Sequence, residues 1–418
     1  MGNLILHFMN PNYILIAIPF FLLTLFIEFI WGRFKKTRFY NFEDTITNLN
    51  LGIGSQAFNT LLKLVLLSLY EFVYINYAPF KIENGVLSFI LCVIVYDFIF
   101  YWAHRWGHEM NIFWGAHIVH HQSEEYNLSV ALRQSWFHNA LAFVLFLPIP
   151  LLGFDPLIFA AAAGFTTLYQ FWIHTKHIKS IGIFEWIFNS PSHHRVHHAT
   201  NPKYLDKNYA AVFIIWDRLF GTFQKEEEEP SYGITLPLNS WNPVWANIHF
   251  YDDLWKGIKK SKRWKDKLLL LFKGPEYLGK LLGQKSEDQL NSKKFSTKVP
   301  ANMQVYVFLQ FVLLLFGLVS YLNHFNELSL FYKLTMFALI TLTTLNCGAI
   351  MENKKWINVV EVARFAAFLP LYNTLYLYYY RNFLSFTFPL SMVLVCIFLT
   401  WIIINQVGKR SENIQQVQ

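Results

Sequence analysis

The chain has 418 residues, of which 54% are hydrophobic and only 15% are charged. Soluble globular proteins carry about 25% charged residues. This composition therefore excludes an ordinary soluble protein and indicates an integral membrane protein. The formal net charge of +8 does not indicate a nucleic-acid partner, because a basic excess in a membrane protein usually marks its cytoplasmic loops.

The apolar runs predict an all-α, multi-span helical bundle, since a membrane-spanning helix needs about 20 mostly apolar residues. A further apolar stretch over 138–173 is divided by prolines and Gly153, which predicts a hairpin of two short helices that returns to its own side. Counting that pair, the chain has roughly nine crossings. The other predicted spans are 13–31, 55–77, 85–103, 304–322, 327–348, 356–379 and 384–405.

Basic residues between the runs predict the orientation of the bundle. The segments "GRFKKTR", "ENKK" and "GKRSEN", together with Arg105 and Arg133, fall on one side if 138–173 is a hairpin. By the positive-inside rule that side is cytoplasmic. We therefore expect a histidine-rich helical cap on the cytoplasmic face of a bacterial inner membrane or of the endoplasmic reticulum.

The long polar interval from about 174 to 303 divides the chain into two units. Its basic stretch "WKGIKKSKRWKDK" is typical of a helix on an anionic membrane surface, and a solvated charged helix is the alternative. The unpatterned segment 282–300 predicts a linker. It would join a membrane-embedded unit with the histidines, at 1–281, to a C-terminal helical membrane bundle at 301–418.

Twelve of the fifteen histidines fall between 104 and 198, and eight of these form three groups with helical spacing. Residues three and four apart share one helix face, so each group can direct its imidazoles at one point. Neutral imidazole binds iron, zinc and copper, and so many nitrogens suit two ions better than one. The predicted ligands are His104, His108, His117, His120, His121, His194, His197 and His198.

Three further residues complete the candidate site. His174 and His177 follow the hairpin on the same predicted side and are candidate ligands. Glu109 is the catalytic candidate, as a metal ligand or as a partner that orients an imidazole; an exposed helix charge is the alternative. His193 lies outside the spacing of its group. The remaining histidines, read as interfacial or core residues, are His7, His138, His249 and His324.

Several kinds of chemistry find no support in the sequence. There is no GxSxG nucleophile elbow, and "GIGSQA" at 52–57 matches a dinucleotide pattern only literally, so we interpret it as the start of a membrane helix. Zinc hydrolases typically use fewer histidines together with carboxylates. Iron that activates dioxygen beside a lipid chain fits better. A histidine-rich metal transporter or sensor is the alternative from another class, and it would place ionisable residues inside the spans.

Two stretches carry a resemblance to known proteins, "HRWGHEMNIFWGAHIVHHQSEEYNLSVALRQS" and "FNSPSHHRVHHATNPKYLDKNYAAVFIIWDRLFGTF". The chain resembles the fatty acid hydroxylase and sterol desaturase superfamily of membrane di-iron histidine-box enzymes, and within it the alkylglycerol monooxygenases. The resemblance implies that the eight histidines are iron ligands and that His174 is an additional one. The spacing from His174 to His177 is HxxH, one residue shorter than the HxxxH spacing of some relatives.

The resemblance also implies a reaction. Two iron ions, dioxygen and tetrahydrobiopterin as electron donor would hydroxylate the ether-bearing carbon of an alkylglycerol lipid and release a fatty aldehyde. A sterol or fatty acyl hydroxylase or desaturase of the same superfamily is the alternative. We interpret Asn208, Tyr209, Trp216 and Asp217 as residues that support the packing of the fold, and the alternative is that they shape or brace the site.

Overall fold

The computed structural model describes residues 12–284, 293–364 and 366, and its regular secondary structure is helical throughout these ranges. The only β pairing among them consists of two isolated bridges, Phe188 with Phe213 and Ala199 with Tyr232. The predicted all-α fold is confirmed.

Five of the described helices are long and apolar enough to cross a membrane. Each contains most or all of one predicted span, whereas the predicted span 384–405 and most of 356–379 lie outside the described residues. The five helices are α2 (Asn12–Phe34), α3 (Phe42–Tyr77), α4 (Val86–Glu109), α15 (Ala301–His324) and α16 (Leu330–Met351).

Helix α3 begins well before the predicted span at 55. Its first turns are polar, so hydropathy does not detect them, but Asn41 caps the helix by accepting a hydrogen bond from the backbone N–H of Asp44. The interpretation of "GIGSQA" as a helix start is therefore wrong. Gly52 and Gly54 lie inside α3, where a Cβ would come within 2.5 Å of Leu132 O and of the Trp136 ring. These glycines allow the segment around Arg133 to approach α3 closely.

The stretch 138–173 is broken, as predicted, near Gly153, whose φ is +85°. Asp155 then caps α9 by accepting a hydrogen bond from Leu157 N–H. With 17 residues, α9 is about 25 Å long, shorter than the hydrocarbon core of about 30 Å. Five full-length spans therefore remain in the described part of the chain. The pieces are α7 (His138–Ala142), η1 (Phe143–Phe146), α8 (Pro148–Leu151) and α9 (Pro156–Trp172).

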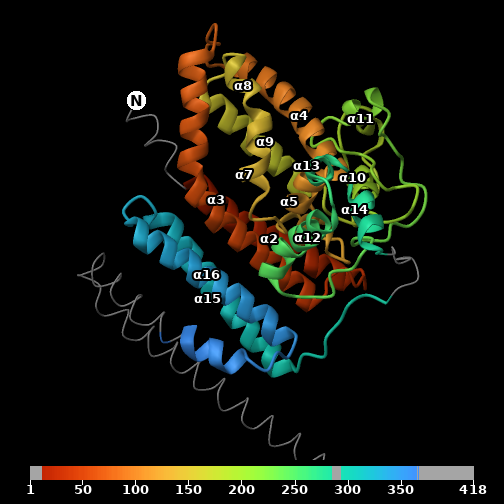
Figure 1. Cartoon of the computed structure of the whole chain (residues 1–418), viewed down its shortest axis with the longest axis vertical. Coiled ribbons are helices and arrows are strands. Elements are labelled where there is room, and N and C mark those ends of the chain that lie inside the picture. Colours follow the sequence, from red (N-terminus) through yellow and green to blue (C-terminus); the bar gives the residue numbers. More distant parts are fainter. Residues whose placement is uncertain (1–11, 285–292, 365, 367–418) are drawn as a thin grey trace, which may run out of the picture.

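Short helices form the histidine-rich part of the molecule beyond the end of α4 (Figure 1). Helix α5 follows α4 directly, and α12 to α14 pack against it. These helices are α5 (Asn111–His121), α6 (Leu128–Ala131), η2 (Gly182–Trp186), α10 (Pro191–His197), α11 (Ile215–Leu219), α12 (Pro243–Lys260), α13 (Trp264–Phe272) and α14 (Pro275–Leu282).

Helices α15 and α16 run side by side along α3 (Figure 1). One apolar cluster joins the three helices, with Ile46 and Ile53 from α3 beside Val307 of α15 and Ile340 of α16. The chain before α15 has no regular secondary structure, and there Phe295 N–H donates to the Glu124 carboxylate at 2.6 Å. Segment 293–299 therefore lies against the loop that follows α5. The division into units at 281 and 301 stays a prediction.

Candidate metal centre

The backbone between α4 and α5 brings the first two histidine groups together. Met110 is extended, with φ of −127° and ψ of 127°, and separates the two helices. The chain therefore turns between His108 and His117, and the histidine face of α5 meets the end of α4. The third group lies on α10, where the Ser190 side chain accepts a hydrogen bond from His193 N–H and Pro191 occupies the first turn, a position that proline favours.

Five imidazoles converge in the first cluster, which consists of His104, His108, His117, His121 and His197. Each offers one ring nitrogen, and these nitrogens all lie within 4.8 Å of one another. The Nε2 atoms of His104 and His117 are 2.9 Å apart, and those of His117 and His121 are 3.0 Å apart. All five side chains are buried.

The second cluster consists of His120, His174, His194 and His198, and its ring nitrogens satisfy the same 4.8 Å limit. The Nε2 atom of His174 lies 3.2 Å from that of His120 and 3.0 Å from that of His194. The Nε2 atoms of His194 and His198 are 3.2 Å apart. The structure thus brings His174 together with the predicted groups.

The two clusters adjoin each other, and the HxxHH spacing explains why. Within each such box the pair four residues apart enters one cluster, while the histidine between them faces the other. His117 and His121 belong to the first cluster and His120 to the second; on α10 the assignment is reversed. The rings of His121 and His198 are 4.4 Å apart between centroids. One box therefore contributes to two neighbouring clusters.

The outer nitrogens of several rings bond to backbone carbonyls. His104 Nδ1 lies 2.6 Å from Tyr209 O, and His120 Nδ1 lies 2.9 Å from Arg133 O. His174 makes the same contact to Gln170 O at 2.7 Å. A carbonyl accepts from N–H, so Nδ1 carries the proton and Nε2 presents its lone pair to the cluster. Such outer contacts accompany most metal-bound histidines.

The donor set fits metal ions. The Nε2 atoms of His108 and His197 are buried without a hydrogen-bond partner, and buried polar atoms in proteins are rarely left so. Burial lowers the pKa of His120 to about 4 and, with the neighbouring imidazoles, holds the pKa of His121 well below its usual range. Both rings are therefore neutral at pH 7, the form that binds metal.

The other predicted residues lie apart from the two clusters. His177 packs its ring 5.1 Å from that of Phe39, and it belongs to neither cluster. The Glu109 carboxylate, on the exposed side of α4, accepts a hydrogen bond from Arg105 Nε at 2.8 Å. The His193 ring lies against Phe223. The roles of His177 and Glu109 stay predictions, and the contacts of Glu109 are those of a surface ion pair.

Two residues beside the first cluster were not singled out for it by sequence reasoning. The Asp206 carboxylate lies 3.7 Å from His108 Nδ1, and Asp206 adopts a left-handed backbone with φ of +58°. The ring of His138 lies 5.6 Å from that of His117, so it is close to the cluster rather than remote from it. Neither has helical spacing to a histidine group, and no local pattern marks Asp206 as a partner of His108.

The "DKNYA" and "WDRLF" segments are joined to each other by hydrogen bonds beside the clusters. Both oxygens of the buried Asp217 carboxylate accept backbone hydrogen bonds, from Tyr209 and Ala210. Asn208 donates to His193 O at 3.0 Å and to Gln224 O at 2.7 Å. These bonds fix the loop whose carbonyls face His104 and His197.

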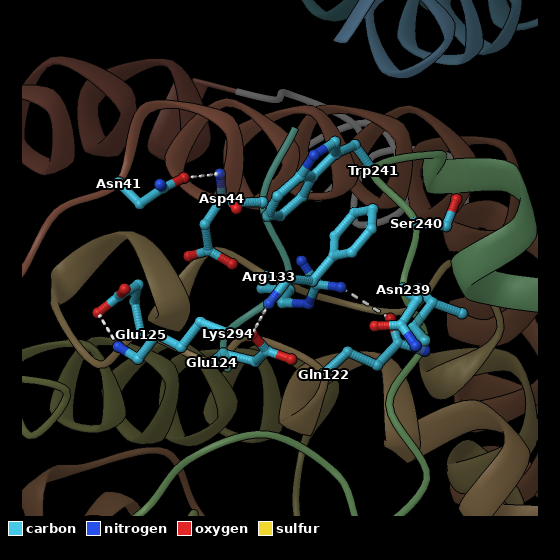
Figure 2. A pocket seen from close by; sticks show the side chains of 13 residues that line it. Asn41, Asp44, Gln122, Glu124, Glu125, Arg133, Asn239, Ser240, Trp241 and Lys294 are labelled. Atoms are coloured by element: carbon cyan, nitrogen blue, oxygen red, sulfur yellow. Dashed lines mark hydrogen bonds and ion pairs between the residues drawn. The ribbon is translucent and has the colours of Figure 1, made fainter. Parts of the chain in front are cut away.

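A polar pocket of about 100 Å³ lies beside the loop that follows α5, and Arg133 is buried in its wall (Figure 2). Its guanidinium donates to Val119 O at 2.6 Å and to Gln122 Oε1 at 2.7 Å, at the end of α5. Lys294 closes another side through an ion pair of 2.7 Å with Glu125 (Figure 2). Arg133 thus orients His120 through its carbonyl and holds the end of α5 through its side chain.

Comparison with known proteins identifies the family. The family model for fatty acid hydroxylase matches residues 89–222, which include both clusters, and the model for the alkylglycerol monooxygenase C-terminal domain matches residues 303–390. The histidine clusters of this chain, together with the match to this family, indicate iron as the metal. No solved structure matches the chain.

Curated relatives extend the match over most of the chain. The alkylglycerol monooxygenase of Homo sapiens is 33% identical over 374 residues, covering 87% of this chain and 83% of the human protein. That of Danio rerio is 36% identical, covering 86% and 84%. A Delta(7)-sterol 5(6)-desaturase of Schizosaccharomyces pombe is 27% identical, covering 38% of this chain and 51% of the desaturase. The chain therefore belongs to the alkylglycerol monooxygenase family of membrane lipid monooxygenases.

Proposed function

We propose that the protein hydroxylates the ether-bearing carbon of an alkylglycerol lipid, with two iron ions held by the two histidine clusters. One oxygen atom of O2 enters the C–H bond and the other leaves as water, while a reductant supplies two electrons and two protons. The hydroxylated ether is a hemiacetal. It then breaks at its C–O bond into a fatty aldehyde and a free glycerol hydroxyl.

The observation that carries this proposal is the pair of adjoining, all-imidazole clusters in a member of this family. The first would hold one ion through His104, His108, His117, His121 and His197. The second would hold the other through His120, His174, His194 and His198. Iron bound there would supply the activation of dioxygen that attack on an alkyl C–H bond requires.

The remaining contributions come from the chain itself. Backbone carbonyls orient the imidazoles, and burial of the ligands excludes water that would compete for the ions. We propose tetrahydrobiopterin as the reductant, because the resemblance to alkylglycerol monooxygenases implies it. The distribution of basic loops supports a cytoplasmic location of the centre, in a bacterial inner membrane or the endoplasmic reticulum.

The test measures iron and product together in freshly isolated membranes. We expect about two irons per chain and pterin-dependent release of aldehyde from an alkylglycerol. His120→Ala and His197→Ala each remove one ligand from a different cluster and should each abolish turnover. Full turnover in either variant would contradict the proposal. His249→Ala, on α12 and outside both clusters, is the matched control.

A sterol is the second candidate substrate because the sterol desaturase of Schizosaccharomyces pombe matches part of this chain. The same membranes would be supplied with sterol, fatty acyl lipid and alkylglycerol, and the oxidised products identified by mass spectrometry. Oxidised sterol without aldehyde from iron-replete protein would replace the alkylglycerol proposal by the sterol one.

A further inference from the structure

The surface around α13 combines cationic and aromatic side chains that the proposed chemistry does not use. From 256 to 273 the chain carries eight basic residues and one acidic residue. Exposed apolar and aromatic side chains of α12, α13 and α14 accompany them. We call this set the α13 surface: Trp255, Trp264, Leu268, Leu269, Phe272 and Tyr277.

Helix α13 has two opposite apolar faces. Trp264, Leu268 and Phe272 are four residues apart and so lie on one face, where they are 69%, 51% and 54% exposed. Leu270 points the other way and is 1% exposed. Packing inside the protein accounts for Leu270 and for the partly buried Leu271. The outer face exposes a tryptophan, a leucine and a phenylalanine. Exposure of such an apolar patch to water is unfavourable and marks an interaction surface.

The inner face is fixed to the histidine helix. Leu270 shares a buried apolar cluster with Ile118 and Val119 of α5 and with Leu278 of α14. Gly257 of α12 makes room for this packing, because a Cβ there would lie 2.6 Å from Leu278 and 2.9 Å from Leu270. Helix α13 is therefore a rigid part of the metal-binding half of the molecule.

The position of α13 along the membrane normal follows from Asn111. Its side chain donates to Leu270 O and its backbone N–H donates to Lys273 O, both at 2.8 Å. Asn111 comes two residues after the end of α4, a helix long and apolar enough to span the membrane. Helix α13 is thus held beside the end of a helix that is long and apolar enough to span the membrane.

The charges around the outer face match lipid headgroups. Lys262, Arg263 and Lys265 are exposed where α13 begins. Lys259 Nζ lies 5.2 Å from the ring of Trp255. Lysines that flank tryptophan in this way extend their amines to phosphates while their stems cover apolar surface, and tryptophan itself is enriched at the interface. Basic surfaces of this kind favour anionic lipids.

From this juxtaposition we propose that α13 lies in the headgroup region of the bilayer. Trp264, Leu268 and Phe272 insert among the lipid chains, and the lysines and arginine around them bind anionic headgroups. The inference concerns depth in the membrane and holds whichever lipid the enzyme oxidises. It makes α13 the element that sets the height of α5, and so of the metal centre, above the hydrocarbon.

The test places an environment-sensitive fluorophore on the outer face of α13. Leu268→Cys and, as a second site, Trp264→Cys are labelled in full-length protein whose native cysteines are replaced by alanine. The protein is reconstituted in vesicles of phosphatidylcholine with about one third phosphatidylglycerol. We expect quenching by nitroxide-labelled lipid and at least about threefold protection from aqueous iodide relative to the control site. Glu229→Cys, on the exposed acidic loop, is that control.

A charge variant separates lipid binding from contact with another protein. Lys262→Glu with Arg263→Glu and Lys265→Glu should reduce the protection in anionic vesicles to its level in pure phosphatidylcholine. If iodide reaches a label at 268 as readily as a label at 229 in the anionic vesicles, the proposal is overturned and the outer face is one for a protein partner. If the charge variant is protected from iodide as strongly as the parent protein in anionic vesicles, the proposed binding of anionic headgroups is contradicted.

Discussion

The nine imidazoles divide between two centres because adjacent histidines on a helix point about 100° apart. His120 and His121 therefore belong to different clusters, and each meets histidines of the α10 box there. An isolated HxxHH box is thus incomplete by itself. Because α5 and the α10 box each contribute histidines to both clusters, the geometry of each cluster depends on the positions of both helices.

Removal of the Asp206 carboxylate tests the partner of His108. Asp206→Asn keeps the size of the side chain but removes the charge beside His108 Nδ1. Loss of such an outer partner typically costs 10–100-fold in metal affinity, so we expect a loss in that range for one of the two ions. Competition with an iron chelator would measure it. Asp252→Asn, on the surface of α12, should leave both affinities unchanged, and an unchanged first ion in Asp206→Asn would contradict the assignment.

Acidification should release the metal ions and destabilise the protein over a defined range. The folded pKa of His120 is about 4, whereas an unfolded histidine titrates near 6.5. As the pH falls from about 6.5 to about 4, His120 binds a proton in the unfolded state but not in the folded state. The free energy of unfolding therefore decreases over this range. Above pH 7 this contribution is constant. Melting temperature and bound iron, followed from pH 8 to 4.5, should fall together, and a loss on the alkaline side would contradict this reading.

At the scale of elements, α3 combines a lipid-facing half with a half buried in protein. Asp44 and Asn48 are bonded to each other, and Asn48 also accepts a hydrogen bond from Arg133 at 2.9 Å. Two turns later Gly52 and Gly54 face the segment 132–136. The polar start of α3 is therefore a platform for the loop whose carbonyl orients His120.

Enlarging Gly54 should disturb that platform. In Gly54→Ala the new Cβ would lie 2.5 Å from Trp136 Nε1, and overpacking of this kind costs about 1–3 kcal/mol. Gly164→Ala in α9 adds the same methyl group where nothing lies within 4 Å, and we expect a neutral or slightly stabilising effect. Thermal unfolding in detergent compares the two variants. Equal melting temperatures would show that Trp136 moves aside freely.

At the scale of the whole molecule, the C-terminal pair α15 and α16 supports the metal-binding half. It covers Ile46 and Ile53 of α3, and segment 293–299 bonds to the loop after His121 through Glu124. A chain that ends at residue 284 would expose both surfaces. We expect this fragment to aggregate when produced alone and to bind iron when co-produced with residues 285–418. Normal iron content in the fragment alone would contradict the dependence.

Hydropathy and helical spacing predicted most of the architecture and the candidate site. A run of about 20 apolar residues predicts a membrane-spanning helix without further information. The three histidine boxes lie on helices, and helical spacing predicts which of their residues share a face. The first turns of α3 escaped because they are buried by tertiary contacts rather than by lipid. The contact of Asp206 with His108 is a nonlocal pairing across about 100 residues. No local pattern specifies such a pair.

The length of α3 has a mechanical consequence for the enzyme in different membranes. Its 36 residues extend about 54 Å, whereas the hydrocarbon core is about 30 Å thick. One end must project, and the platform for Arg133 lies in that projecting end. In a thicker or thinner bilayer, the membrane-spanning part of α3 can change its tilt. The spacing of the imidazoles does not change, because it is set at the projecting end of the helix.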